Sequence, residues 1–527
     1  MAEKIQTIVI SSILGGMSPT SHFASSNQFR ASMGVDPAQP IDDSDTAYST
    51  VASGLLRPVA SEKFSSTTIG SAPLWIVTNP KNSNVYVLDA LGSAYTVNDT
   101  LTTITAIADA GELSNGIGNG AEYYDNYVYF AKNTTIARIG PLNGSTTING
   151  DYWVTTLAKT ALVNTTYPTT AKNGLQIPNH PLHRHSDGRL YFGDVVGNQG
   201  YLHYIATTKT TVEGDTNNSS TYQALAFGYG LWPTSIESYG SDLSVALYEG
   251  SNTGLRQKHA KMAFWDTSSS SFNKNTWVEF PDAIITAQKN INGTLFVASG
   301  NYQTKGFRIT KFIGGYSYQE VYYSETGEPP LQGAFEGVLN RLVFGTNTNV
   351  PESDGVVHSI GLQKNILGSG LFNVMRATGG NSSTTVTSVS FADATENGFY
   401  VPIIGWTDGT SHGLDKQGTA YNNAPSVWWS QMFRIGQPFK ITKIIIPLAQ
   451  AVGANMIVTP KIYTDDGANS TTLTTINNTN YSGKYTVMQK PSGLTGQNNF
   501  WLELRWTGSA LCTVNLPITI EFELIPE

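Results

Sequence analysis

One short pattern recurs seven times along this 527-residue chain: a turn residue followed at once by a short apolar strand. The turn residue is Asn, Asp or Gly, and the strand after it is rich in Val, Leu, Tyr and Phe, which favour strands. The copies are Asn84–Val87, Asn126–Phe130, Gly188–Phe192, Asp242–Val245, Gly293–Val297, Asn340–Phe344 and Asn397–Val401. Successive turns are 42, 62, 54, 51, 47 and 57 residues apart.

This interval is that of a four-stranded antiparallel unit, which needs roughly 40 to 50 residues. Such units cannot bury both faces alone, so each must pack radially against the next. The pattern therefore predicts a β-propeller of about seven blades over residues 65–430. Polar insertions such as Gly214–Ser220 account for the longer intervals. Because the copies are divergent, six or eight blades remain alternatives.

Composition agrees with an all-β protein. Charged residues are 13% and hydrophobic residues 40%, with 51 Gly, 26 Tyr and 21 Phe, which indicates packed strands joined by many turns. The net charge of −8 has no basic block beside it, so a broad nucleic-acid surface is not expected. The lone Cys512 excludes an intramolecular disulfide and fits assembly in a reducing cytosol. The apolar run Ile5–Leu14 is too short to span a membrane.

Two further segments flank the repeats. Residues 1–64 carry Pro, Gly and scattered apolar side chains without strand periodicity, and we expect an extended N-terminal arm that docks on a neighbour through Phe23, Phe29 and Met33. Residues 431–527 contain five or more alternating strands, for example Ile518–Leu524. That density of strands predicts a C-terminal β-sandwich.

The densest polar cluster is His180, His183 and His185, with Asp187 and Asp194 nearby. Imidazoles at this density bind zinc in some proteins. His183 and His185, however, are two residues apart on an expected strand, without the helical spacing of metalloproteases. A polar blade edge or channel lining is the favoured interpretation, and we expect no metal, cofactor-binding or catalytic residues in the chain.

Other signatures of enzymes are missing from the sequence. It contains no phosphate-binding loop, no nucleophile elbow and no paired Cys ligands. The Gly-rich run Asn115–Gly120 opens a strand rather than a helix. The repeated turn of propeller sialidases does not occur. Trp428–Trp429, Trp232 and Trp406 offer possible sugar-stacking surfaces, with packing the favoured interpretation.

The low charge, the Ser/Thr/Asn-rich turns and two short segments carry a resemblance to a known group of proteins. The segments are Gly15–Pro19 with Phe29-Arg30, and Trp75–Asn82 ahead of the first repeat. In these features the chain resembles propeller-bearing virion proteins of tailed bacteriophages, especially tail nozzle or tail-tip components. The likeness covers residues 60–500 and its motifs are loose.

The resemblance implies a non-enzymatic structural protein of the virion, assembled in the host cytoplasm into a homo-oligomeric ring with other tail proteins. It also implies a role in the DNA-exit channel and transient contact with exiting DNA. The alternative function is a receptor- or glycan-binding adhesin whose sandwich is the recognition module, and a propeller glycosidase is a third. Fold alone does not decide between them.

Overall fold

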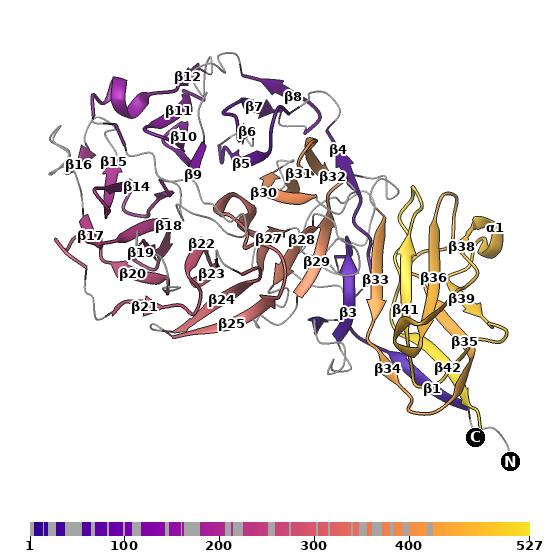
Figure 1. Ribbon diagram of the computed structural model, residues 1–527. Helices are drawn as coiled ribbons and strands as arrows, with labels where there is room; N and C mark the ends of the chain where they lie inside the picture. Colours follow the sequence, from indigo (N-terminus) through magenta and orange to yellow (C-terminus); the bar gives the residue numbers. More distant parts are fainter. Residues whose placement is uncertain are drawn as a thin grey trace.

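The computed structural model is almost entirely β-structure and confirms an all-β propeller (Figure 1). It describes residues 5–526 except 14, 19–27, 37–54, 65–68, 82–83, 99–100, 108–116, 143–146, 160, 163–179, 206–211, 214–224, 251–258, 273–275, 302–303, 315–316, 339–340, 347–355, 361–370, 380–383, 394–399 and 419–424.

Seven antiparallel sheets form the blades of the propeller, and the strands of each blade run in order from the innermost to the outermost. Blade 1 is β5 (Pro73–Thr78), β6 (Val85–Asp89), β7 (Ala94–Val97) and β8 (Ile104–Ala106); blade 2 is β9 (Ile117–Tyr124), β10 (Tyr127–Lys132), β11 (Ile136–Gly140) and β12 (Thr147–Asn149); blade 3 is β13 (Leu182–Arg184), β14 (Leu190–Val196), β15 (Gln199–Ile205) and β16 (Val212–Glu213), with β17 (Leu225–Tyr229) also on β15. Blade 4 is β18 (Leu231–Tyr239), β19 (Asp242–Glu249), β20 (Lys261–Trp265) and β21 (Val278–Glu279); blade 5 is β22 (Ile284–Ile291), β23 (Thr294–Gly300), β24 (Phe307–Gly314) and β25 (Ser317–Ser324). Blade 6 is β26 (Phe335–Val338), β27 (Arg341–Thr346), β28 (Val356–Ile360) and β29 (Leu371–Arg376); blade 7 is β30 (Thr385–Asp393), β31 (Tyr400–Thr407), β32 (His412–Gln417) and β4 (Ser61–Lys63).

Each of the seven sequence repeats lies at the second strand of one blade. The reason is the tight hairpin between the first and second strands. In blade 2, Asp125 and Asn126 both have positive φ, 44° and 68°, between the paired residues Tyr124 and Tyr127. Two consecutive positive φ values match the twist of a hairpin and favour Asn, Asp and Gly. The repeated turn residue is thus a backbone requirement.

Apolar clusters fill the spaces between neighbouring blades. Phe130 of blade 2 shares a cluster with Leu88 of blade 1, and Phe344 of blade 6 shares one with Phe296 of blade 5. Two small elements lie among the blades: the π-helix η2 (Tyr152–Thr156) and the 3-10 turn η4 (Gln332–Ala334). Burial between blades, about 25 cal/mol per Å² of apolar surface, is what each sheet lacks by itself.

The ring is closed by a strand from the other end of the chain. Strand β4 pairs antiparallel with β32, so that Lys63 is opposite Asp415. Blade 7 therefore takes three strands from residues 385–417 and its outermost strand from the segment that we expected to be part of an arm. No edge is left between the first and last blades (Figure 1).

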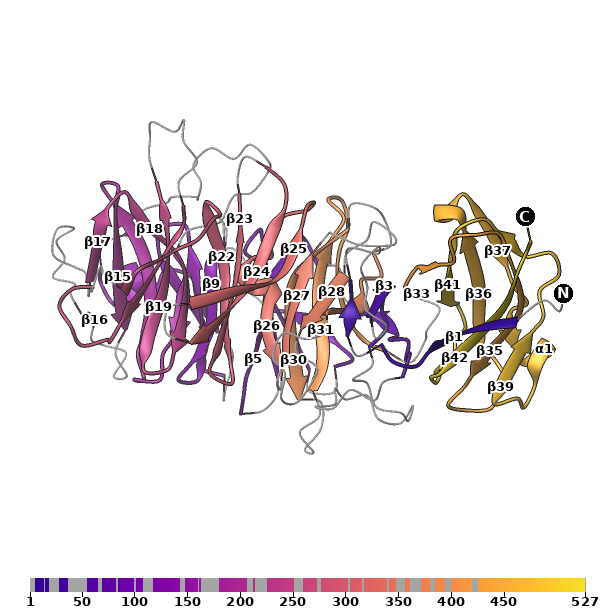
Figure 2. The same cartoon turned by 90° about the horizontal axis from the view of Figure 1, so that it is seen from below.

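The second domain is a sandwich of two sheets, beside the propeller (Figure 2). The first of them, sheet A, has the order β1 (Ile5–Ile10), β42 (Ile518–Leu524), β35 (Phe439–Pro447) and β39 (Thr486–Gln489), with β40 (Thr495–Gly496) also on β35. The second, sheet B, has the order β2 (Gly16–Met17), β3 (Gln28–Met33), β33 (Ser426–Ser430), β41 (Asn499–Trp506), β36 (Ile457–Thr464) and β37 (Asn469–Thr472), with β34 (Phe433–Arg434) on β41 and β38 (Ile476–Asn477) on β36. Helix α1 (Asn478–Tyr481) and the turn η5 (Asp465–Gly467) complete it.

The N-terminal segment differs most from our expectation. Its described residues are not an arm on a neighbour but strands of the chain's own sheets: β1 pairs with β42, and β3 with β33. Phe29 and Met33 are buried there, 1% and 0% exposed, while Phe23 lies outside the described residues. The sandwich likewise begins before residue 431, because β33 lies between β3 and β41. Periodicity failed to reveal these strands because most of their partners are more than 390 residues away.

A buried ion pair joins the two domains. Arg341, at the start of β27, donates to both carboxylate oxygens of Asp36, with N–O distances of 3.2 and 3.0 Å. The side chains are 1% and 0% exposed. Nearby, Leu56 bridges to Val514 of the sandwich before the chain continues into β4. The N-terminal segment therefore ties the sandwich to the propeller.

Candidate functional site

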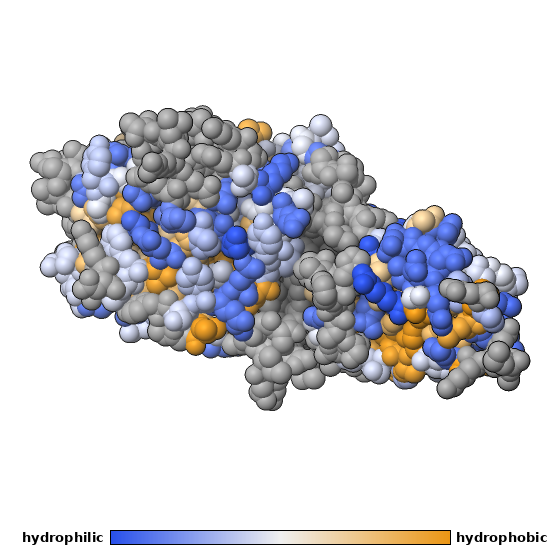
Figure 3. All heavy atoms as spheres, turned by 60° about the horizontal axis from the view of Figure 1, so that its bottom comes forward, coloured by the Kyte–Doolittle hydropathy of each residue, from blue (hydrophilic) through white to orange (hydrophobic). Residues whose placement is uncertain are grey.

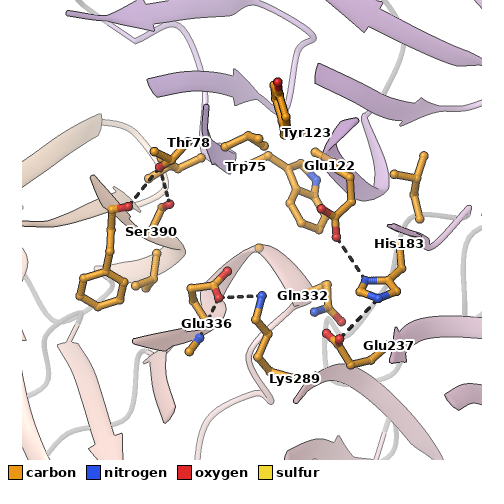
Figure 4. A pocket seen from close by; sticks show the side chains of 18 of the residues that line it. Trp75, Thr78, Glu122, Tyr123, His183, Glu237, Lys289, Gln332, Glu336 and Ser390 are labelled. Carbon is orange, nitrogen blue, oxygen red and sulfur yellow. Dashed lines mark hydrogen bonds and ion pairs between the residues drawn. The ribbon is translucent and has the colours of Figure 1, made fainter. Parts of the chain in front are cut away.

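The inner strands of all seven blades surround a central cavity of about 350 Å³ (Figure 4). Its polar lining is charged on five consecutive blades: Glu122 on β9, His183 on β13, Glu237 on β18, Lys289 on β22 and Glu336 on β26. Each lies on the innermost strand of its blade. Because inner strands have the same position in every blade, these side chains meet around one axis.

The charges pair across blade boundaries. The Nδ1 of His183 is 3.3 Å from Glu122 Oε1, and its Nε2 is 3.5 Å from Glu237 Oε1. Lys289 Nζ is 2.7 Å from Glu336 Oε1. His183 thus connects blades 2, 3 and 4, and Lys289 connects blades 5 and 6 (Figure 4). The ring of charges holds blades together as well as lining a cavity.

The protonation of these groups follows from their neighbours. Burial by itself lowers the pKa of His183, but Glu237 and Glu122 outweigh it and the net shift is upward. Burial raises the pKa of Glu237, with His183 and Lys289 opposing the shift. Burial lowers the pKa of Lys289, yet Glu336 and Glu237 raise it overall. The cavity therefore favours protonated His183 and charged Lys289.

Uncharged side chains complete the lining. Gln332 donates its amide Nε2 to the Gln288 carbonyl (2.7 Å) and accepts from Ser235 Oγ (2.7 Å), which fixes its orientation. On the opposite side, the hydroxyls of Thr78 and Ser390 are 3.2 Å apart. These contacts link blades 4, 5, 7 and 1, so polar interactions follow the whole circumference of the cavity.

The three clustered histidines do not converge. Only His183 lines the cavity. His185 shares Ser238 Oγ with it, at 2.8 and 2.9 Å, whereas His180 is fully buried against the carbonyls of Gly193 and Asn133. Within the described ranges, no three His, Cys, Asp or Glu side chains are arranged to hold a metal ion. Of the two interpretations, channel lining describes His183.

The tryptophans are mostly packing residues. Trp232, Trp406 and Trp428 are 5%, 3% and 0% exposed. Trp429 is half-buried on the outer face of sheet B, where its Nε1 donates to Glu503 Oε2 (2.9 Å). Strand β9 begins within the Gly-rich run at residue 117, as its position ahead of a strand predicted.

Four of the cavity residues escaped our sequence reasoning, although a signal for them exists. In blades 2 to 6 a charged residue or His lies four or five positions before the repeated turn: Glu122, His183, Glu237, Lys289 and Glu336. That offset places each on the inner strand at a similar height above its hairpin. A search at a fixed offset from the turns would have found the ring.

No family model matches this sequence, and no curated protein matches it either. Two solved structures are similar over much of the chain. The computationally designed Ika8 protein aligns at 13% identity with a TM-score of 0.37, covering 67% of this chain and 99% of its own. The Pan2 WD40 domain of Neurospora crassa aligns at 8% identity with a TM-score of 0.39, covering 68% and 95%. Such low scores carry no argument, and the seven-bladed assignment stands on the strand pairing. No helix in the described part of the chain has the length and hydropathy to cross a membrane.

Proposed function

We propose that this chain is a structural component of a tailed-phage virion, in the tail nozzle or tail-tip class, that assembles in several copies around the DNA-exit channel. The observation that carries the proposal, beside the resemblance in sequence, is an apolar row on the outer face of sheet A. Val9, Thr519, Ile445 and Met488 are cross-strand neighbours through all four strands of the sheet.

The row is open to solvent in a single copy of the chain. Val9 is 52% exposed and Met488 50%, and Figure 3 shows apolar side chains grouped on the sandwich. Strand β1, Ile-Gln-Thr-Ile-Val-Ile, is the terminal strand of sheet A and carries no charge or Pro. Uncharged edge strands are templates for pairing with another chain, and monomeric proteins usually protect them. This combination supports an assembly surface.

The remainder of the molecule suits a rigid scaffold. The propeller has no open edge, its blades are connected by ion pairs around the cavity, and a buried ion pair fixes the sandwich to blade 6. A component that transmits force or maintains a ring needs this stiffness more than it needs a mobile cleft.

The test is electron microscopy and light scattering of the full-length protein, alone and in purified particles. We expect multi-copy rings or a defined position in the tail. Val9→Asp combined with Met488→Asp should leave the melting temperature unchanged and abolish assembly, while Leu91→Asp, at a 65% exposed position on the propeller, should assemble normally. A chain that stays monomeric and is absent from particles refutes the proposal, as does normal assembly of the double variant.

A second function, that of a receptor- or glycan-binding adhesin, is favoured by one specific observation. The outer face of sheet B carries a polar pocket beside a cluster of aromatic rings. Aromatic faces next to hydrogen-bonding groups are typical of sites that bind small polar ligands. The two functions are compatible, because they use opposite faces of the sandwich.

A further inference from the structure

Three aromatic side chains from adjacent strands meet on the outer face of sheet B. The rings of Tyr463 and Trp501 are stacked, with centroids 5.1 Å apart and planes at 8°. Trp429 lies 6.1 Å from Trp501 and 5.7 Å from Tyr463. The register explains the grouping, because Tyr463 of β36 is directly opposite Trp501 of β41. These rings form the floor on which a fourth residue rests.

That fourth residue is Arg30 of β3. Its guanidinium carbon lies 4.2 Å from the centroid of Trp501 and 5.3 Å from that of Trp429. Stacking of this kind orients the planar guanidinium. Its Nη1 is buried and has no hydrogen-bond partner among the residues that the structure describes. A buried guanidinium nitrogen without an acceptor is unusual and indicates a missing anionic or oxygen-bearing group.

Arg30 forms part of the wall of an open pocket of about 560 Å³. The other lining residues are Met432, Arg434, Gly436, Asp466, Asn498 and Asn499. Two guanidinium groups and one carboxylate give this wall a formal charge of +1. Side-chain amides of Asn add hydrogen-bond donors and acceptors that suit hydroxyl groups.

A strained turn holds Asp466 at the pocket. Asp465, Asp466 and Gly467 have consecutive positive φ values of 56°, 56° and 88°. For residues with a side chain this conformation costs free energy and persists only where surrounding contacts enforce it. In this turn the backbone N–H of Asp466 donates to Asn499 Oδ1 (2.9 Å), and Asn499 Nδ2 donates to Asp466 Oδ1 (3.0 Å).

The same turn also fixes the neighbouring loop. The carboxylate of Asp465 accepts the backbone N–H groups of Gln497 (2.6 Å) and Asn498 (3.2 Å). Two loops that are more than 30 residues apart in the sequence are therefore locked together at the pocket. The site is rigid before any ligand arrives, which lowers the entropic cost of binding.

We propose that this pocket binds a saccharide that carries a carboxylate. Arg30 and Arg434 would hold the carboxylate, since a guanidinium matches its two oxygens. Asp466 and Asn498 would take the ring hydroxyls. The pocket volume fits one or two sugar residues. The proposal deepens the adhesin function and does not depend on assembly through sheet A.

The experiment is titration of the full-length protein with D-glucuronate, followed by calorimetry and by tryptophan fluorescence. D-glucose and acetate serve as separate probes of the hydroxyl and carboxylate contributions. We expect glucuronate to bind and to perturb the fluorescence, because Arg30 rests on Trp501. Glucose and acetate should each bind about tenfold more weakly or worse.

Arg30→Met keeps the aliphatic packing on the indole and removes the charge. It should weaken glucuronate binding by about tenfold or more. Arg505→Met is the matched control, since Arg505 belongs to the same sheet but does not line the pocket, and it should bind as the original chain does. If Arg30→Met lowers the melting temperature, Asn498→Ala provides a second test at a loop position.

The proposal is overturned if glucuronate does not bind, if acetate or glucose binds as tightly, or if Arg30→Met and Asn498→Ala both bind normally. Each of these outcomes leaves the assembly role on sheet A untouched. Conversely, a failure of assembly by the sheet A variants would not alter the titration, so the two proposals fail separately.

Discussion

The ion pair between Asp36 and Arg341 offers the most direct test of how the two domains are held together. Asp36→Asn keeps the shape and one acceptor oxygen but removes the charge, leaving Arg341 buried without its counter-ion. A hydrogen bond to a charged group is worth about 1.5–3 kcal/mol, and the pair makes two. Breaking a buried pair typically costs about 3–5 kcal/mol. Because Asn retains one bond, we expect a loss of about 3 kcal/mol of unfolding free energy.

The assay is urea unfolding followed by tryptophan fluorescence and by circular dichroism. Glu521→Gln is the matched control, because its partner Lys443 and Glu521 are 25% and 22% exposed, and such pairs contribute less than about 1 kcal/mol. Asp36→Asn combined with Arg341→Met should recover much of the loss, since the orphaned charge is gone. A single Asp36→Asn variant as stable as Glu521→Gln would show that this contact does not hold the domains.

Three further predictions follow from burial and charge. Met33→Ala should cost about 2–5 kcal/mol in the same unfolding assay, because Met33 is fully buried in β3, whereas a loosely docked arm would lose almost nothing. Since the pKa of His183 is raised in the folded state, its contribution is complete below the unfolded value of about 6.5 and is lost as the pH rises through the folded value. The stability difference between the original chain and His183→Gln should therefore be larger near pH 5 than near pH 8, and an equal difference at both would contradict the ion-pair role. Cys512 is 1% exposed and burial raises the pKa of its thiol to about 12, so a thiol reagent should react only after unfolding; rapid labelling of the native protein would contradict this.

Local chemistry explains which parts of the fold could be predicted from the sequence. A tight hairpin requires particular residues at particular positions, so Asp125-Asn126 and its counterparts mark every blade. The alternation of Ile518–Leu524 likewise indicates a strand with one buried face. Both signals depend only on neighbours in sequence, and both predicted elements that the structure contains.

Long-range pairing left no such signal. Strand β4 has three residues and pairs with β32, and its sequence Ser-Glu-Lys does not favour a strand. The sheet B pocket combines Arg30 with Trp501, which are brought together only by the order of strands in the sheet. The cavity charges are intermediate, because their offset from each turn is regular but becomes meaningful only once the blades are aligned around an axis.

The closure of the ring by β4 also dictates an order of events during synthesis. Lys63 leaves the ribosome 352 residues before its partner Asp415. At about 5–20 residues per second, β4 waits roughly 20–70 seconds for the last blade to be translated. Strand β1 waits longer still, since β42 lies at the opposite end of the chain. Neither domain can be completed on a growing chain, so both must finish together at or after the end of translation, and the exposed edges of the half-built blades must be kept from pairing elsewhere until then.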